Sequence, residues 1–302
     1  MNIVQIFEDK KKISPPKWLS TNLVYLIDMG SHAYGCNGEN SDFDIFGFTI
    51  PPKNLVFRSN EIPGFGKQFE RFSVWQEHHA KHPDNNNSPD YDFCIYSIVD
   101  YFNLAMNANP NITDGLFVPQ RCIRHITTIG QMVRDNRKLF LHKGCFKKMR
   151  GYALSQIHKM KEKNPGERTG KRVADVEKHG YDLKFAYHTV RLCLECEQIL
   201  TDHDLDLEKD REVYKAIRRG DWTEAEIYEF FNRKEKSLDE LCQKSTLPHH
   251  PDEEAIKNLL LQCLEHHYGS LESCIASTDF KEQELAKAFT QIRDICNKVK
   301  CI

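Results

Sequence analysis

Hydrophobic and polar residues follow different periodicities in the two halves of the chain. In the first half, short apolar segments rich in β-branched and aromatic residues alternate with polar turns, and they predict strands at 21–28, 44–50, 68–76 and 91–98. A helical pattern follows at 99–108, while the polar run 82–90, rich in Asn, Pro and Asp, predicts a surface loop. This alternation favours a mixed α/β fold.

From about residue 121 onward, apolar residues recur at the spacing of amphipathic helices. They predict helices at 126–140, 145–162, 184–200, 253–271 and 282–299. A chain of 302 residues is long enough for two modest domains, so we expect an α/β domain over residues 1–142 and a helical domain over residues 143–302. Within the second, the basic, glycine-bearing segment 163–180, with Lys171 and Arg172, predicts either a loop that closes over a ligand or a solvated linker.

Composition narrows the class of protein. Hydrophobic content of 40% and charged content of 28% are ordinary for a soluble globular protein. A net charge of -2 argues against non-specific coating of nucleic acid, although 42 basic residues leave room for a local basic groove. The first residues lack the apolar core of a signal peptide, and no apolar run approaches the length of a membrane span. We therefore expect a cytoplasmic protein with no membrane partner.

The 11 cysteines show no paired spacing, so we expect free thiols in a reducing compartment. Cys193 and Cys196 form a C-x-x-C within a helical pattern, and no second pair at metal-site spacing accompanies them. A helix therefore explains this pair better than a structural zinc site does.

A short stretch between two predicted strands carries the candidate chemistry. Residues 28–48 read DMGSHAYGCNGENSDFDIFGF, and Asp42 and Asp44 lie two positions apart where the second strand begins. Alternate residues of a strand face the same way, which places these carboxylates about 6–7 Å apart at Cα. Such a pair suits two divalent ions, and without a cation their repulsion raises one of the two pKa values. Turn and cap chemistry is the alternative, because Ser and Asp bond readily to local backbone.

Gly30 and Ser31 complement these carboxylates. A strand that runs into glycine and then into a short helix exposes backbone N–H groups, and a helix N-terminus favours phosphate oxygens. The Ser31 hydroxyl adds a further donor to the same anion. We therefore expect phosphate-binding and metal-binding residues on consecutive pieces of the chain.

The run GSHAYG followed by SDFD resembles the signature of the DNA polymerase beta superfamily of nucleotidyltransferases. More narrowly, it is similar to the RNA-ligase-associated polymerase-beta-like nucleotidyltransferases, and the similarity covers most of residues 22–200. The resemblance implies an α/β (α+β) fold, with a polymerase-beta-like core built on a mixed sheet and a mostly helical domain after it. It also implies a third metal carboxylate from a neighbouring strand, at the position of Asp92. Asp90 lies close to it and is better explained as a loop-end cap.

Two positions depart from the pattern of that group. Its members tend to carry an arginine where this chain has Phe46, and a glutamate where it has Asp114 after Asn109-Pro110. The loss of the arginine weakens one contact to phosphate or to the carboxylates. An inactivated relative is therefore an alternative, although the metal carboxylates and the Gly-Ser pair remain.

The predicted helix 184–200 carries Lys184, His188 and Arg191 on one stripe. From their spacing alone, a solvated face is the usual explanation. The resemblance implies instead that Lys184 and Arg191 contact triphosphate oxygens, Arg191 as a bidentate clamp. For His188 it implies a bond to phosphate or ribose, with a structural histidine as the alternative. Tyr34 is expected to pack against the Gly-Ser turn rather than to stack on a base.

Together these features predict a nucleotidyltransferase that uses two Mg²⁺ or Mn²⁺ ions to move a nucleoside monophosphate from an NTP to a hydroxyl, with release of pyrophosphate. Asp42, Asp44 and Asp92 are the expected catalytic and metal residues. The family name points to an RNA acceptor such as a tRNA-like end. Adenylylation of a protein, as in toxin–antitoxin systems, and a non-catalytic module that binds nucleotides or RNA ends are the alternatives, and an interaction scaffold built on the helices is a third. The paired histidines at 78–79, 249–250 and 266–267 are expected at the surface.

Overall fold

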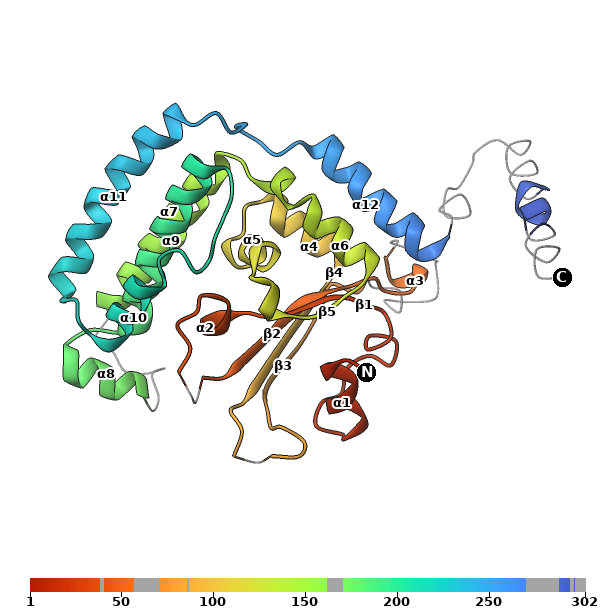
Figure 1. Ribbon diagram of the computed structural model, residues 1–302, viewed down its shortest axis with the longest axis horizontal. Coiled ribbons are helices and arrows are strands. Elements are labelled where there is room, and N and C mark those ends of the chain that lie inside the picture. The colour runs from red at the N-terminus through yellow and green to blue at the C-terminus, as the bar shows by residue number, and fades with distance from the viewer. Residues whose placement is uncertain are drawn as a thin grey trace, which may run out of the picture. The chain divides into compact units, whose positions relative to one another are not determined.

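In the computed structural model, five strands form one mixed sheet in the order β3-β4-β2-β1-β5 (Figure 1). Their bounds are β1 Leu23–Asp28, β2 Phe43–Thr49, β3 Val74–Ala80, β4 Tyr91–Ser97 and β5 Ile123–Ile126. β2 and β4 are parallel, and the other neighbouring pairs are antiparallel. The sheet therefore brings together the strand ends at Phe43 and Tyr91, which are 48 positions apart in the sequence.

The structure describes residues 1–38, 41–56, 71–85, 87–161, 171–269, 288–293 and 296. The chain divides into two units, residues 1–260 and residues 261–302, and the sheet lies in the first. Of the segment 163–180 that was predicted to be a loop or a linker, residues 163–170 lie outside the described residues. The prediction is wrong for the rest, because Lys171–His179 form helix α8, and of Lys171 and Arg172 only the backbone is described. No helix within the described ranges has the length and apolar composition needed to cross a membrane.

Helices cover both faces of the sheet. The first group has the bounds α1 Ile3–Asp9, α2 Gly30–Ala33, α3 Lys53–Val56, α4 Ile98–Met106, α5 Pro110–Phe117 and α6 Thr128–Asp135, with short 3₁₀ helices at Gln120–Cys122 and Arg137–Phe140. α4, α5 and α6 lie over one face, and α1 lies against the other (Figure 1).

Strand alternation sorts the core between these two faces. Phe93 of β4 packs with Phe7 of α1, with ring centroids 5.3 Å apart. Phe48 of β2 packs on the other side against Tyr101 of α4, at 4.7 Å. All four rings are buried. The period of two along the strands is thus satisfied by apolar partners on both faces.

The rest of the unit is helical. Its elements are α7 Gly144–Lys161, α8 Lys171–His179, α9 Leu183–Asp202, α10 Arg211–Arg219, α11 Glu224–Lys244 and the first part of α12 Glu253–Tyr268. α7 and α11 pack against α9, which is buried along most of its length (Figure 1). Asp182 begins α9 by accepting hydrogen bonds from the N–H groups of Lys184 and Phe185 at 2.9 and 3.2 Å. Cys193 and Cys196 are buried in this helix.

The predicted fold class is confirmed, with a mixed sheet followed by a mostly helical region. Four predicted strands and the helices at α4, α6, α7, α9 and α12 correspond to observed elements, although β3 begins later than predicted, at Val74. The pattern missed β5 and the helices α1, α3, α5, α8, α10 and α11. The boundary at residue 142 stays a prediction.

Candidate active site

Asp44 and Asp92 lie side by side at the ends of two parallel strands. They form a register pair between β2 and β4, and adjacent strands are about 4.8 Å apart. Both residues are half-buried. Asp42 precedes β2 by one residue and is exposed, and its Oδ1 accepts a hydrogen bond from the Asp90 N–H at 3.3 Å. The structure therefore brings the three predicted carboxylates together at the N-terminal ends of β2 and β4.

The surroundings of Asp44 are electrostatically unusual. Burial raises the pKa of its carboxyl group, and the negative charges of Asp92 and Asp42 raise it further. Lys184 of α9 and His32 of α2 act in the opposite direction and lower this pKa. A site with this balance favours a cation, because a cation would relieve the repulsion between the carboxylates.

Gly30 lies directly against Asp44. A Cβ placed on Gly30 would come within 1.9 Å of Asp44 Oδ2, and the residue has a φ of +60°, which favours glycine. The Met29 N–H also donates to the Asp44 carbonyl at 2.8 Å. The glycine is therefore required by contact with a carboxylate, a reason that sequence alone does not reveal. Ser31 follows it, but α2 is only one turn long, so the helix dipole expected here is small.

A bulge in β3 faces the third carboxylate. The pairing of β3 with β4 shifts between Glu77 and Ala80, and the His79 N–H donates to Asp92 Oδ1 at 2.8 Å. The His78 ring nitrogen Nδ1 lies 3.5 Å from the same oxygen. These histidines are exposed, as expected, and they lie on β3. Nothing in the local sequence pattern indicates their place beside Asp92.

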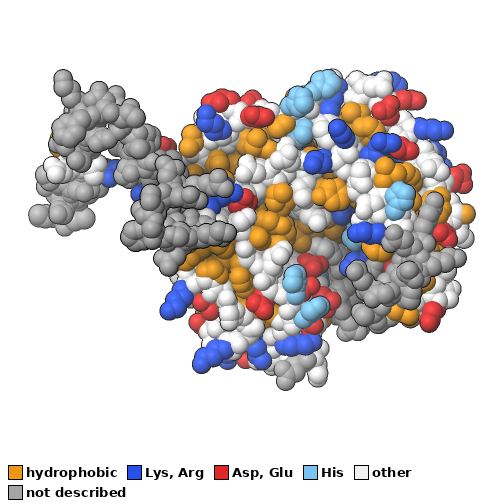
Figure 2. Space-filling model, turned by 180° about the vertical axis from the view of Figure 1, so that it is seen from behind, with side chains coloured by type: hydrophobic (Ala, Val, Ile, Leu, Met, Phe, Trp, Pro, Cys, Tyr) orange, Lys and Arg blue, Asp and Glu red, His pale blue; other side chains and the backbone are white. Residues whose placement is uncertain are grey.

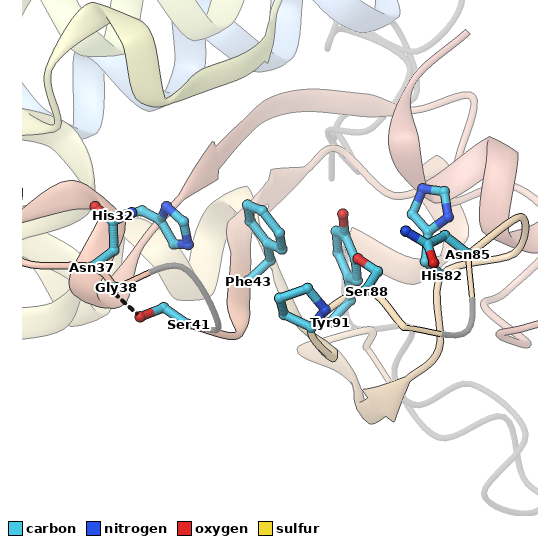
Figure 3. A pocket seen from close by; sticks show the side chains of 10 residues that line it. His32, Asn37, Gly38, Ser41, Phe43, His82, Asn85, Ser88 and Tyr91 are labelled. Carbon is cyan, nitrogen blue, oxygen red and sulfur yellow. Dashed lines mark hydrogen bonds between the residues drawn. The ribbon is translucent and has the colours of Figure 1, made fainter.

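An aromatic row supports the opposite side of the same strand ends. His32 of α2, Phe43 of β2 and Tyr91 of β4 stack in sequence, with centroids 4.5 and 4.8 Å apart and interplanar angles of 12° and 19° (Figure 3). Phe43 and Tyr91 alternate with the aspartates, so their rings point to the other face of the sheet. They border an open cavity of about 560 Å³. The row joins the three elements that carry Ser31, Asp44 and Asp92.

The stripe on α9 becomes more buried along its length. Lys184 is exposed, His188 is half-buried, and Arg191 is only 3% exposed. Arg191 donates from Nη1 to the carboxylates of Asp114 and Glu195, the latter at 2.9 Å. The structure thus brings Lys184 close enough to influence Asp44, whereas it places Arg191 in a buried ion-pair network and not at an open surface.

The remaining predicted residues take supporting positions. Tyr34 is 3% exposed, and its ring packs against Tyr187 and Tyr214 of the helical region. Phe46, where an arginine was expected, fills space next to Tyr96 and Tyr101, with centroids 5.5 and 6.3 Å away. The side chain of Asp90 forms an ion pair with Lys81. The position of Phe46 therefore serves packing.

One face of the molecule shows acidic and histidine side chains side by side near its centre (Figure 2). Among the described residues, no group of three or more His, Cys, Asp or Glu side chains already stands in an arrangement that could hold a metal ion. Asp42 and Asp92 instead accept bonds from backbone N–H groups. The carboxylates are adjacent but not arranged around a common centre.

The sequence model of one protein family, "RlaP: RNA repair pathway DNA polymerase beta family", matches residues 4–269. A crystal structure of a nucleotidyltransferase-like protein from Exiguobacterium sibiricum 255-15 is similar to this chain at 12% sequence identity. That match covers 80% of this chain and 73% of the other, with a TM-score of 0.26, a likeness too weak to support an argument about function. None of the curated proteins matches the chain.

Proposed function

This chain belongs to the RlaP family of RNA-repair nucleotidyltransferases of the polymerase beta type, and we propose that it transfers a nucleoside monophosphate from an NTP to a hydroxyl group of RNA, with release of pyrophosphate. The observation that carries the proposal is the register pair of Asp44 and Asp92, with Asp44 lying directly against Gly30. Carboxylates and a phosphate-binding turn are thus parts of one continuous site.

The donor set fits divalent metal ions. Asp42, Asp44 and Asp92 offer only carboxylate oxygens, which are the ligands that Mg²⁺ and Mn²⁺ prefer. The raised pKa of Asp44 supports this assignment, because part of the rise comes from the neighbouring carboxylates and a cation would cancel it. Divalent ions, when bound, supply Lewis-acid stabilisation of the transferring phosphoryl group. Asp42, Asp44 and Asp92 would hold these ions, and the backbone hydrogen bonds to Asp42 and Asp92 would orient their carboxylates.

The protein's own groups divide the remaining work. Ser31 donates a hydrogen bond to a non-transferred phosphate, and Gly30 lets the backbone approach closely. Lys184, which is exposed and electrostatically close to Asp44, neutralises charge on the triphosphate. Asp92 accepts the proton of the attacking hydroxyl or orients that hydroxyl, while the His79 N–H fixes one of its oxygens. His188 lies one turn after Lys184 and contacts the ribose or a phosphate.

An RNA end is the proposed acceptor, since the family description names an RNA repair pathway. A hydroxyl at the end of a cleaved tRNA-like molecule provides the chemistry that the reaction needs. Transfer to a protein hydroxyl is the competing outcome. Labelling in the presence of each kind of acceptor separates the two.

The test offers each α-labelled NTP with Mg²⁺ or Mn²⁺ to total RNA and to a protein extract. The proposal expects label on RNA, sensitive to nuclease, from wild-type protein and from Asp90→Asn. Asp90 is a matched control, because it lies two residues from Asp92 and pairs with Lys81. Asp44→Asn is expected to be inactive. Nuclease-resistant label on protein would overturn the RNA acceptor, and NTP binding without pyrophosphate release would overturn catalysis altogether.

A further inference from the structure

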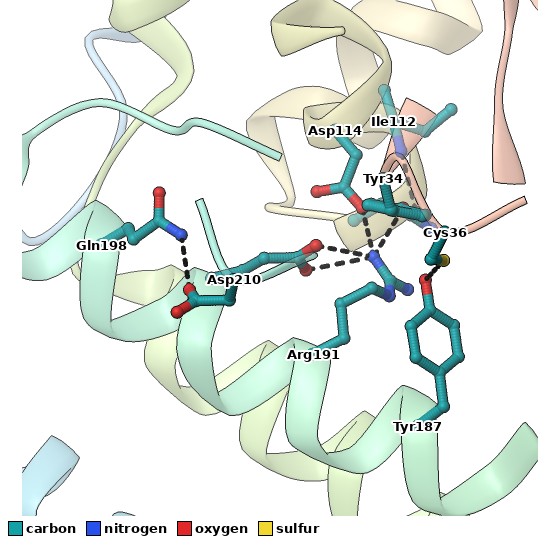
Figure 4. A network of polar contacts seen from close by, with 10 residues as sticks. Tyr34, Cys36, Ile112, Asp114, Tyr187, Arg191, Gln198 and Asp210 are labelled. Carbon is teal, nitrogen blue, oxygen red and sulfur yellow. Dashed lines mark hydrogen bonds and ion pairs between the residues drawn. The ribbon is translucent and has the colours of Figure 1, made fainter. Parts of the chain in front are cut away.

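A buried ion-pair network joins α2 and α5, beside the sheet, to α9 of the helical region. Arg191 of α9 donates from Nη1 to Tyr34 Oη at 2.6 Å, to Asp114 Oδ2 of α5, and to Glu195 Oε1 of α9 at 2.9 Å (Figure 4). The Tyr34 hydroxyl donates in turn to Asp114 Oδ2 at 2.6 Å. The Arg191 guanidinium also lies over the Tyr34 ring, 4.5 Å from its centroid.

All four side chains of this network are withdrawn from water. Asp114 and Glu195 have no exposed surface, and Tyr34 and Arg191 are each 3% exposed. Burying charges costs free energy that their mutual attraction only partly returns, so such a network is weak evidence for stability alone. It does require one arrangement of its members, because a displaced partner leaves a buried charge uncompensated. The network therefore fixes how α2, α5 and α9 meet.

On the α9 side, the network lies on the same stripe as Lys184. Arg191 follows Lys184 by seven residues, which is about two turns or 10.5 Å along the helix. Lys184 projects into solvent, and its charge acts on Asp44. Since an α-helix is stiff over two turns, fixing Arg191 also fixes the backbone position from which the Lys184 side chain extends.

On the α2 side, the network begins three residues after Ser31. α2 is a single turn, and Tyr34 is its C-terminal cap. The turn after Tyr34 is also held by the helical region, because Arg218 Nη1 of α10 donates to the Cys36 carbonyl at 3.0 Å. The short segment with Gly30 and Ser31 therefore has the catalytic sheet at one end and the helices at the other.

We propose that Tyr34 and Arg191 are positioning residues that set the separation of Ser31 and Lys184, so that both reach one triphosphate. This inference rests on the nucleotidyltransferase proposal and adds how the helical region takes part in nucleotide binding. Arg191 acts through Lys184 and does not itself touch the nucleotide. The proposal thus gives Arg191, the third basic residue on the α9 stripe, a role in positioning Lys184 and none in contacting the nucleotide.

A double-mutant cycle on Tyr34→Phe and Lys184→Ala tests this role. The ligand is tripolyphosphate with Mg²⁺, which avoids the question of base preference, and dissociation constants are measured by calorimetry. Loss of a hydrogen bond to a charged group predicts that Tyr34→Phe weakens binding about tenfold when Lys184 is present. In the Lys184→Ala background the same substitution is expected to weaken binding by less than about twofold.

Tyr25→Phe is the matched control. The Tyr25 hydroxyl is equally buried, donates to the Gly115 carbonyl at 3.0 Å and accepts from Arg134 Nη1 at 2.9 Å, but it has no bond to α9. Its effect on binding is expected to be small and the same in both backgrounds. If Tyr34→Phe does not fold, Arg191→Lys, which keeps the charge and loses the fork, replaces it in the cycle.

The outcomes separate the two proposals. If the wild-type protein binds tripolyphosphate with Mg²⁺ but the effects of Tyr34→Phe and Lys184→Ala on binding are independent, the positioning role alone is overturned. Failure of the wild-type protein to bind tripolyphosphate with Mg²⁺ would overturn the nucleotidyltransferase proposal and the inference with it. Coupled effects, absent from the Tyr25→Phe control, would support both.

Discussion

Replacing Gly30 by alanine changes the site at the contact on which the proposed chemistry depends. The added methyl carbon would lie 1.9 Å from Asp44 Oδ2, and an ordinary contact begins at 3.4 Å. The gap must therefore open by about 1.5 Å, so the Asp44 carboxylate must leave its present position beside the register partner Asp92. The backbone also resists the change, because φ is +60° at this position.

The two costs have different consequences. An L-residue in the left-handed region loses roughly 1–2 kcal/mol of stability, and an off-rotamer Asp44 adds about 0.5–1.5 kcal/mol. These sum to about 1.5–3.5 kcal/mol of unfolding free energy. Activity suffers more, since a misplacement of about 1 Å at a reacting group costs about 100-fold in rate. We therefore expect Gly30→Ala to fold and to lose at least about 100-fold in single-turnover transfer.

Gly180→Ala provides the control for the backbone term. Gly180 has a φ of +82°, and a Cβ there would meet nothing within 4 Å. Urea unfolding is expected to show a loss of roughly 1–2 kcal/mol for this variant, with transfer close to wild type. The reasoning fails if Gly30→Ala transfers label within about threefold of Gly180→Ala under saturating Mg²⁺. Contact between Gly30 and Asp44 would then have no part in arranging the site.

Three further substitutions test the electrostatics of the site. Asp44→Asn is expected to raise the urea midpoint of the metal-free protein at pH 7. Burial and the neighbouring carboxylates raise the pKa of Asp44, so its ionised form destabilises the folded protein. Mg²⁺ should no longer raise the Tm of this variant. Burial raises the pKa of Glu195 from 4.5 to about 8, so its contribution to stability is present below pH 4.5 and is lost as the pH rises through about 8. Urea unfolding of Glu195→Gln at pH 5 and pH 8 should therefore show a smaller decline than wild type, and an unchanged decline would contradict this. Lys184→Ala should weaken tripolyphosphate binding about tenfold by calorimetry, and unaltered affinity would remove Lys184 from the site.

The sequence predicted the parts of the site that depend on local period. Asp42 and Asp44 follow from the alternation of residues along a strand, and the helical stripe with Lys184 and Arg191 follows from a period of 3.6. The resemblance to a family, rather than the pattern, pointed to Asp92. Nothing local states that β4 lies next to β2, because strand order is set by tertiary packing, so the register pair became visible only in the fold.

Depth below the surface was the quantity that the pattern could not supply. A helical stripe tells which residues share a face, but it does not tell how the burial of that face changes along the helix. The α9 stripe passes from solvent at Lys184 to a closed junction with α2 and α5 at Arg191. The β3 bulge at His78 and His79 was missed for a related reason, since a bulge reflects pairing with a particular partner strand.

This division of the stripe changes how charge is balanced in the proposed reaction. Arg191 is bonded to the buried side chains of Asp114 and Glu195, so of the three basic residues on the predicted stripe only Lys184 and His188 are left to meet a triphosphate that carries several negative charges. Phe46 occupies the position where the resemblance led us to expect another arginine, and it packs against aromatic rings instead. Neutralisation must therefore depend more on ions bound by Asp42, Asp44 and Asp92 than the sequence pattern suggests. The catalytic rate should accordingly respond more steeply to the choice and concentration of divalent metal than to removal of Lys184.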